Sequence, residues 1–147
     1  MKHTRFLPAA VADVHGSETY PNLRGQVRFY QRRHCVLVET NVQGLPDTDT
    51  GFFGFHIHSG ASCTGVDFAD TSSHYNPTEL PHPSHAGDMP PLLSCHGNAV
   101  MTVATGRFRV DDIIGRTVVI HSMADDFNSQ PAGNAGAKIA CGVIRKV

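Results

Sequence analysis

The sequence predicts an all-β fold, a sandwich or barrel with two long functional loops. Helix signals are weak along the whole chain. Short β-branched or apolar runs recur from end to end, separated by Gly, Pro, Asn and Asp, which is typical of strands joined by turns. Two stretches, 59–91 and 122–136, fit no regular element, and each is longer than about 12 residues, a length at which a loop is usually functional or disordered. Because both stretches adjoin histidines, function is favoured over disorder.

The predicted strands have one apolar face. In RGQVRFYQ, Val27 and Phe29 alternate with polar neighbours, so this strand would turn one side toward a core. Turn residues at 44–47 end one strand, and those at 105–106 separate two others. Strands are expected, with boundaries uncertain by a few residues, at 9–14, 25–31, 35–42, 52–58, 98–104, 107–110, 116–121 and 138–143.

The bulk properties restrict the class of protein. A chain of 147 residues is expected to form one domain, 1–147, with a real hydrophobic core. The formal net charge of −1 offers no basic surface for nucleic acid and no reason for an anionic membrane partner. No stretch approaches the roughly 20 apolar residues of a membrane span. The N-terminal apolar segment is broken by Pro8 and Asp13 and is a poor signal peptide, so we expect a cytoplasmic protein, or a periplasmic or secreted one if a leader has been removed.

The stretch 51–88 carries five of the ten histidines. His56 and His58 are two apart in a predicted strand, where side chains at i and i+2 project from one face roughly 7 Å apart and could bind one ion. The following loop, rich in Pro, Gly and Ser, could wrap round a second ion. Imidazole suits zinc and copper, and a carboxylate that completes a histidine set suits zinc. The potential ligands of that loop are His74, His82, His85 and Asp88.

Five motifs occur in order along the chain: GFHIH, SSHYNP, HPSHAGD, GRTVVIH followed by ADD, and GNAGAKIACGVI. With them, from about residue 25 to 144, the sequence resembles the copper-zinc superoxide dismutases. The resemblance implies an eight-stranded antiparallel Greek-key β-barrel, an immunoglobulin-like sandwich, with the metal site held outside the barrel by two long loops. It also implies superoxide as the substrate and copper and zinc as cofactors.

The motifs imply a role for each matched residue. His74 would bridge the two metals through its deprotonated imidazole. Asp125 would hydrogen-bond the free ring nitrogens of one copper-bound and one zinc-bound histidine, which fixes their orientation. A redox-active copper ion needs an open face, whereas a closed zinc set orders the loop. The implied ligands are His56, His58, His74 and His121 for copper, and His74, His82, His85 and Asp88 for zinc.

Lys138 stands where the family has an arginine, two residues after GNAG. Lysine keeps the positive charge but lacks the planar fork of arginine. We therefore expect Lys138 to attract superoxide and to position it more loosely. The loop after Asp126, FNSQPAGNAG, is shorter than is usual in the family and lacks its charged residues, which weakens long-range guidance.

The four cysteines fit no CxxC pattern, so spacing alone favours reduced thiols in a cytosol. The resemblance instead implies a disulfide between Cys63 and Cys141. More residues lie between Cys63 and His74 than the family usually has, so the loop path would differ. Cys35 and Cys95 have no counterpart; a second bridge and separate buried thiols both stay open.

Two other functions compete with the enzyme. One is a non-enzymatic protein on the same barrel, zinc-only, a copper store or a copper chaperone. The other, a zinc hydrolase, is disfavoured because no Glu accompanies the histidines as a general base. The resemblance leaves a homodimer and a copper donor protein open as partners. The remaining histidines, expected to be surface or strand residues, are His3, His15, His34 and His96.

Overall fold

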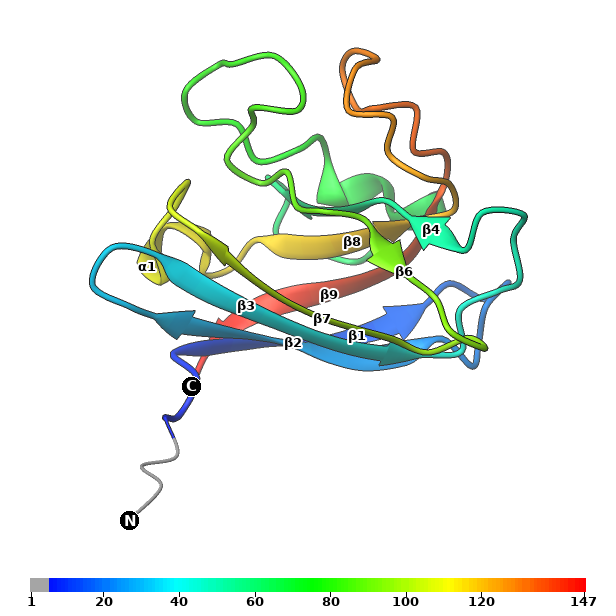
Figure 1. Cartoon of the computed structure of the whole chain (residues 1–147), viewed down its shortest axis with the longest axis horizontal. Helices are drawn as coiled ribbons and strands as arrows, with labels where there is room; N and C mark the ends of the chain where they lie inside the picture. The colour runs from blue at the N-terminus through cyan, green and yellow to red at the C-terminus, as the bar shows by residue number, and fades with distance from the viewer. Residues whose placement is uncertain (1–5) are drawn as a thin grey trace.

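The computed structural model describes residues 6–147, and the prediction for His3 lies outside them. Seven strands form one antiparallel sheet in the order β5-β8-β9-β1-β2-β3-β7, which curls into a half-barrel (Figure 1). The chain crosses the barrel from β3 to β5 and from β7 to β8, as in a Greek key. The all-β fold is thus confirmed. The strands are β1 (Ala10–Gly16), β2 (Arg24–Gln31), β3 (Val36–Gln43), β5 (Phe55–His58), β7 (Ala99–Thr105), β8 (Thr117–His121) and β9 (Lys138–Lys146).

The core fills the inside of the curled sheet. Val27 and Phe29 of β2 are fully buried there while Arg28 between them is exposed, as the alternation predicts. β5 and β8 differ from β2 because every one of their residues is buried. Phe55 and Ile57 face the core, so the alternate residues of β5 lie on the outer face. That outer face is buried because the two long loops cover it, and it carries histidines.

Two predicted strands differ from the structure. The segment 52–58 is broken at Gly54: β4 (Phe52–Phe53) pairs with β6 (Leu92–Leu93), and only β5 joins the main sheet. The residue at the break must be small, because a Cβ on Gly54 would lie 2.7 Å from that of Ala135. The prediction at 107–110 was wrong. The chain there enters a short helix, α1 (Val110–Ile113), whose start is capped by the Asp112 carboxylate, which accepts from the Arg109 N–H.

Both long loops were correctly predicted, and they rise from the same side of the sheet (Figure 1). The first contains a 3-10 helix, η1 (Val66–Thr71). It is tied to β9 by the Cys63–Cys141 disulfide, which is confirmed. Cys35 and Cys95 are free, and Cys95 is exposed, so neither a second bridge nor a buried thiol at Cys95 is present.

The described histidines outside the motifs, His15, His34 and His96, are exposed as expected. Within residues 6–147, no helix has the length and apolar character needed to cross a membrane.

Candidate metal centre

The ligand loop returns along the free edge of β5. Tyr75 N–H donates to the Ile57 carbonyl and Ile57 N–H donates to the Gly87 carbonyl, both at 2.8 Å. These bonds align the loop with the strand, so that His74 lies opposite His58 and Asp88 lies opposite His56. Residues far apart in the sequence are therefore brought together by backbone pairing with one short strand.

Four histidines form the first group, which we call the copper group: His56, His58, His74 and His121. One ring nitrogen from each lies within 4.8 Å of those of the others, and all four side chains are buried. His121 reaches them from the end of β8, where its N–H donates to the Gly54 carbonyl at 2.8 Å. The structure thus brings this predicted set together.

Two rings of the copper group face each other through ring nitrogens, an arrangement that suits a cation. Nδ1 of His58 lies 2.9 Å from the Ser72 carbonyl, and Nδ1 of His121 lies 3.2 Å from the Gly136 carbonyl. Burial lowers the pKa of His58 to about 2 and that of His121 to about 3, so both rings are neutral. Each Nδ1 donates to its carbonyl, which leaves two Nε2 lone pairs facing each other at 3.2 Å. Two lone pairs at that distance repel unless a cation lies between them.

The second group, which we call the zinc group, consists of His74, His82, His85 and Asp88, again buried and within 4.8 Å of one another. The carboxylate is its centre: His74 Nδ1 lies 2.8 Å from Asp88 Oδ1, and His85 N–H donates to Oδ2 at 3.0 Å. Burial acts to raise the pKa of Asp88, but the hydrogen bond with His74 and the electrostatic effects of His74, His82 and His85 together outweigh it and lower that pKa. Three imidazoles and one ionised carboxylate form a donor set that suits zinc.

His74 belongs to both groups. Its Nδ1 faces the zinc group, and its ring stacks on that of His56 with centroids 4.0 Å apart. Its Nε2 is buried without a hydrogen-bond partner among the described residues. This is the arrangement that a ligand shared between two metals requires.

Asp125 joins the two groups from the second loop. Its Oδ2 lies 2.7 Å from His56 Nε2, and its Oδ1 lies 2.8 Å from His82 Nε2. Burial acts to raise the pKa of Asp125, but the bonds with His56, the Phe127 N–H and His82 lower it, so the carboxylate is ionised. Because Asp125 contacts Nε2 of both His56 and His82, Nδ1 is the ring nitrogen of each that could bind a metal.

The donor atoms fit bound metals. Two buried ring nitrogens, His56 Nδ1 and His74 Nε2, have no hydrogen-bond partner within residues 6–147, and a third, His82 Nδ1, lies 3.0 Å from Asp88 Oδ2 without forming a hydrogen bond. Leaving a buried polar atom unpaired costs about 1–3 kcal/mol, so several in one site need an explanation. All three belong to the two groups, and copper and zinc both accept neutral imidazole.

Lys138, at the start of β9, lies beside the copper group. Its Nζ donates at 3.0 Å to the Ser72 carbonyl, which is also the partner of His58. Burial lowers the pKa of Lys138, and its positive charge contributes to the lowered pKa of His58 and His121. The predicted cation is therefore present at the site, held by a single bond to a carbonyl.

Sequence reasoning missed the residues that hold the loops in place. Gly133 has φ +70°, and a Cβ there would lie 2.1 Å from Asp125 Oδ1, so only glycine fits. The GNAG motif was the available signal for this position. Arg107 and Gln130 bond the backbone of the zinc loop and gave no signal in the sequence.

A curled antiparallel sheet with two buried histidine groups that share one imidazole defines a β-protein with two adjoining candidate metal sites. The sequence model of the copper/zinc superoxide dismutases matches residues 23–144, and the chain belongs to that family. Several curated relatives carry the name of this oxidoreductase.

Three relatives illustrate the range of similarity. Superoxide dismutase [Cu-Zn] 2 of Aquifex aeolicus is 34% identical over 82% of this chain and 78% of its own length. Superoxide dismutase [Cu-Zn] of Legionella pneumophila is 31% identical over 95% and 92%. The copper chaperone for superoxide dismutase of Rattus norvegicus is 31% identical over 95% of this chain but only 54% of its own length.

Proposed function

We propose that this protein is a superoxide dismutase that holds copper and zinc and converts superoxide to oxygen and hydrogen peroxide. The observation that carries the proposal is His74, whose two ring nitrogens face two complete and adjoining ligand groups. Four imidazoles suit copper in both oxidation states, and three imidazoles with Asp88 suit zinc.

The chemistry that copper supplies when bound is one-electron transfer, between Cu(II) and Cu(I), which oxidises one superoxide and reduces the next. Zinc has no redox chemistry, so the zinc group orders the loop and orients the shared imidazole. His74 Nε2 is the proton-handling atom of this proposal. It is buried within the copper group, would take up a proton from solvent when it is not a ligand, and would give that proton to the reduced oxygen species, while water supplies the second proton of hydrogen peroxide.

Lys138 attracts the substrate anion. Oriented positive charge at a site raises association rates by roughly 10- to 1,000-fold. The Lys138 ammonium keeps this charge effect. It is held by a single hydrogen bond to the Ser72 carbonyl, so its position is less fixed than that of an arginine, whose planar group can make two parallel bonds. Asp125 does not contact the substrate; it orients His56 and His82 from behind.

The similarity to a copper chaperone supports one alternative, a non-enzymatic copper protein on the same fold. The two candidates differ in their activity after copper loading, because a chaperone binds copper without removing superoxide. A zinc-only protein would leave the copper group without a metal.

The test is to purify the full chain, quantify both metals, and assay superoxide removal. We expect one copper and one zinc per chain and rapid superoxide removal. His121 belongs to the copper group alone, so His121→Ala is expected to lose copper and activity and to keep zinc. A protein that retains zinc but stays inactive after copper loading would exclude the enzyme.

A further inference from the structure

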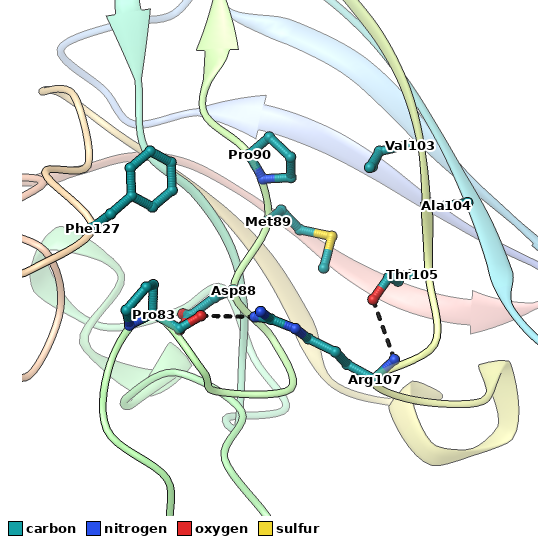
Figure 2. Close-up of a pocket in the computed structure, with 9 residues that line it drawn as sticks. All are labelled: Pro83, Asp88, Met89, Pro90, Val103, Ala104, Thr105, Arg107 and Phe127. Carbon is teal, nitrogen blue, oxygen red and sulfur yellow. Dashed lines mark hydrogen bonds between the residues drawn. The ribbon is translucent and has the colours of Figure 1, made fainter.

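The short turn that carries His82 and His85 is held by two side chains from distant parts of the chain. The Gln130 side chain accepts from the His82 N–H at 2.9 Å and donates to the His82 carbonyl at 2.7 Å. Arg107 Nη1 donates to the Pro83 carbonyl at 2.8 Å, drawn in Figure 2, and to the His85 carbonyl at 3.1 Å. Four backbone groups of a four-residue turn are thus bonded from outside the turn.

We propose that Arg107 and Gln130 are positioning residues for zinc, which fix the backbone of the 82–85 turn before the metal binds. This inference rests on the proposed zinc assignment of the group. Two of the four zinc ligands project from this turn, so a shift of its backbone would move both ring nitrogens together. A site held near its final geometry loses less freedom when it binds, and its affinity is higher for that reason.

Arg107 is anchored on a rigid support. It follows β7, and its own N–H donates to Thr105 Oγ1 at 3.2 Å (Figure 2). From the sheet edge its guanidinium reaches two carbonyls at once, with charge-assisted bonds that a compact ammonium reproduces less well. A cavity lined by Met89, Pro90 and Phe127 lies beside the turn (Figure 2). Arg107 and Pro83 line the same cavity, and their hydrogen bond joins the sheet edge to the turn there.

Gln130 holds the turn from the opposite loop. Its primary amide pairs with the backbone of His82: the amide oxygen accepts from the His82 N–H, and the amide nitrogen donates to the His82 carbonyl. Asp125 of the same loop bonds the His82 ring. His82 is therefore held by its backbone and its ring from a single loop, the one that also supplies the Gly136 carbonyl to His121 of the copper group. The second loop thus contacts the zinc turn through Gln130 and Asp125, and the copper group through a separate residue, Gly136.

The first measurement is zinc affinity, by competition with a chelator of known affinity, on the full-length chain and at a temperature well below the unfolding midpoint of every variant. Outer contacts of metal ligands typically change affinity by 10- to 100-fold. We expect Arg107→Ala and Gln130→Ala each to weaken zinc binding by roughly 10-fold. Copper affinity, measured in the same way, is expected to change by less than roughly 3-fold, because neither His82 nor His85 belongs to the copper group.

Matched controls separate positioning from general damage. Arg33→Ala removes an exposed arginine, and Asn128→Ala removes an amide from the same loop as Gln130; neither side chain makes a hydrogen bond within residues 6–147. Both controls are expected to bind zinc as the wild type does. Arg107→Lys, which keeps the charge, is expected to recover part of the affinity lost in Arg107→Ala.

The second measurement is hydrogen exchange of the His82 amide in metal-free protein. We expect protection in the wild type and faster exchange in Gln130→Ala but not in Asn128→Ala. Unchanged zinc affinity in both Arg107→Ala and Gln130→Ala, with a wild type that binds zinc, would overturn this inference alone. A wild type that binds no zinc but protects the His82 amide would overturn the proposed zinc assignment and its consequence here.

Discussion

Replacing Gly133 by alanine tests how the second loop supports both metal groups. The added Cβ would lie 2.1 Å from Asp125 Oδ1 and 2.6 Å from His82 Nε2. Ordinary contact begins at 3.4 Å, so the carboxylate would have to move by about 1.3 Å. That movement breaks the 2.8 Å bond between Asp125 and His82, and both groups are buried.

Two terms contribute to the expected loss. Alanine at a left-handed φ costs roughly 1–2 kcal/mol. Breaking a hydrogen bond to a charged group adds about 1.5–3 kcal/mol. Gly115 provides the matched control, because its φ of +82° imposes the same backbone strain but its added Cβ would meet nothing within 4 Å. The difference between the two variants isolates the broken bond.

Urea denaturation of metal-free protein gives the free energy of unfolding of each variant. We expect Gly133→Ala to be less stable than Gly115→Ala by about 1.5–3 kcal/mol, and only Gly133→Ala to bind zinc more weakly. Equal destabilisation of the two variants, with equal zinc affinity, would refute the argument that Gly133 exists to admit the Asp125 bond.

Three further predictions rest on single contacts. The hydroxyl of Thr40 is buried without a partner among residues 6–147, so Thr40→Val is expected to raise the free energy of unfolding by about 1 kcal/mol in urea denaturation; a loss of stability would contradict this. Lys138→Ala is expected to slow superoxide removal by roughly 10-fold and to flatten its salt dependence, whereas an unchanged rate at low ionic strength would assign steering to another cation. Denatured, unreduced protein should contain two free thiols, because Cys63 and Cys141 are bridged; a count of four would rule the bridge out.

The fold could be predicted where a strand has one buried face. In β2 the alternation around Val27 and Phe29 follows directly from the pleat. The break at Gly54 could not be predicted, because the contact that requires glycine there is made with Ala135 of a distant loop. The error at 107–110 has a local cause: the apolar residues there favour a strand, but the cap supplied by Asp112 favours a helical turn.

The metal centre, like the fold, could be predicted only in part from the sequence. The spacing of His56 and His58 predicts one shared face, and the structure places both on the outer side of β5. His121 could be added only through the resemblance to a family, since nothing local links it to β5. Arg107 and Gln130 form hydrogen bonds with backbone groups 22 to 48 residues away. A sequence pattern does not indicate which distant carbonyl a side chain will contact.

The two-sided burial of β5 constrains how this chain can vary and how it folds. Phe55 and Ile57 fill the core while His56 and His58 face the ligand groups, so shifting the pairing with β8 by one residue would exchange every side chain between these environments. A misaligned strand would lose its apolar burial and its metal ligands together. A bound metal would therefore favour the correct strand alignment, and a mutation that shifts β5 would disturb the core and the ligand groups together.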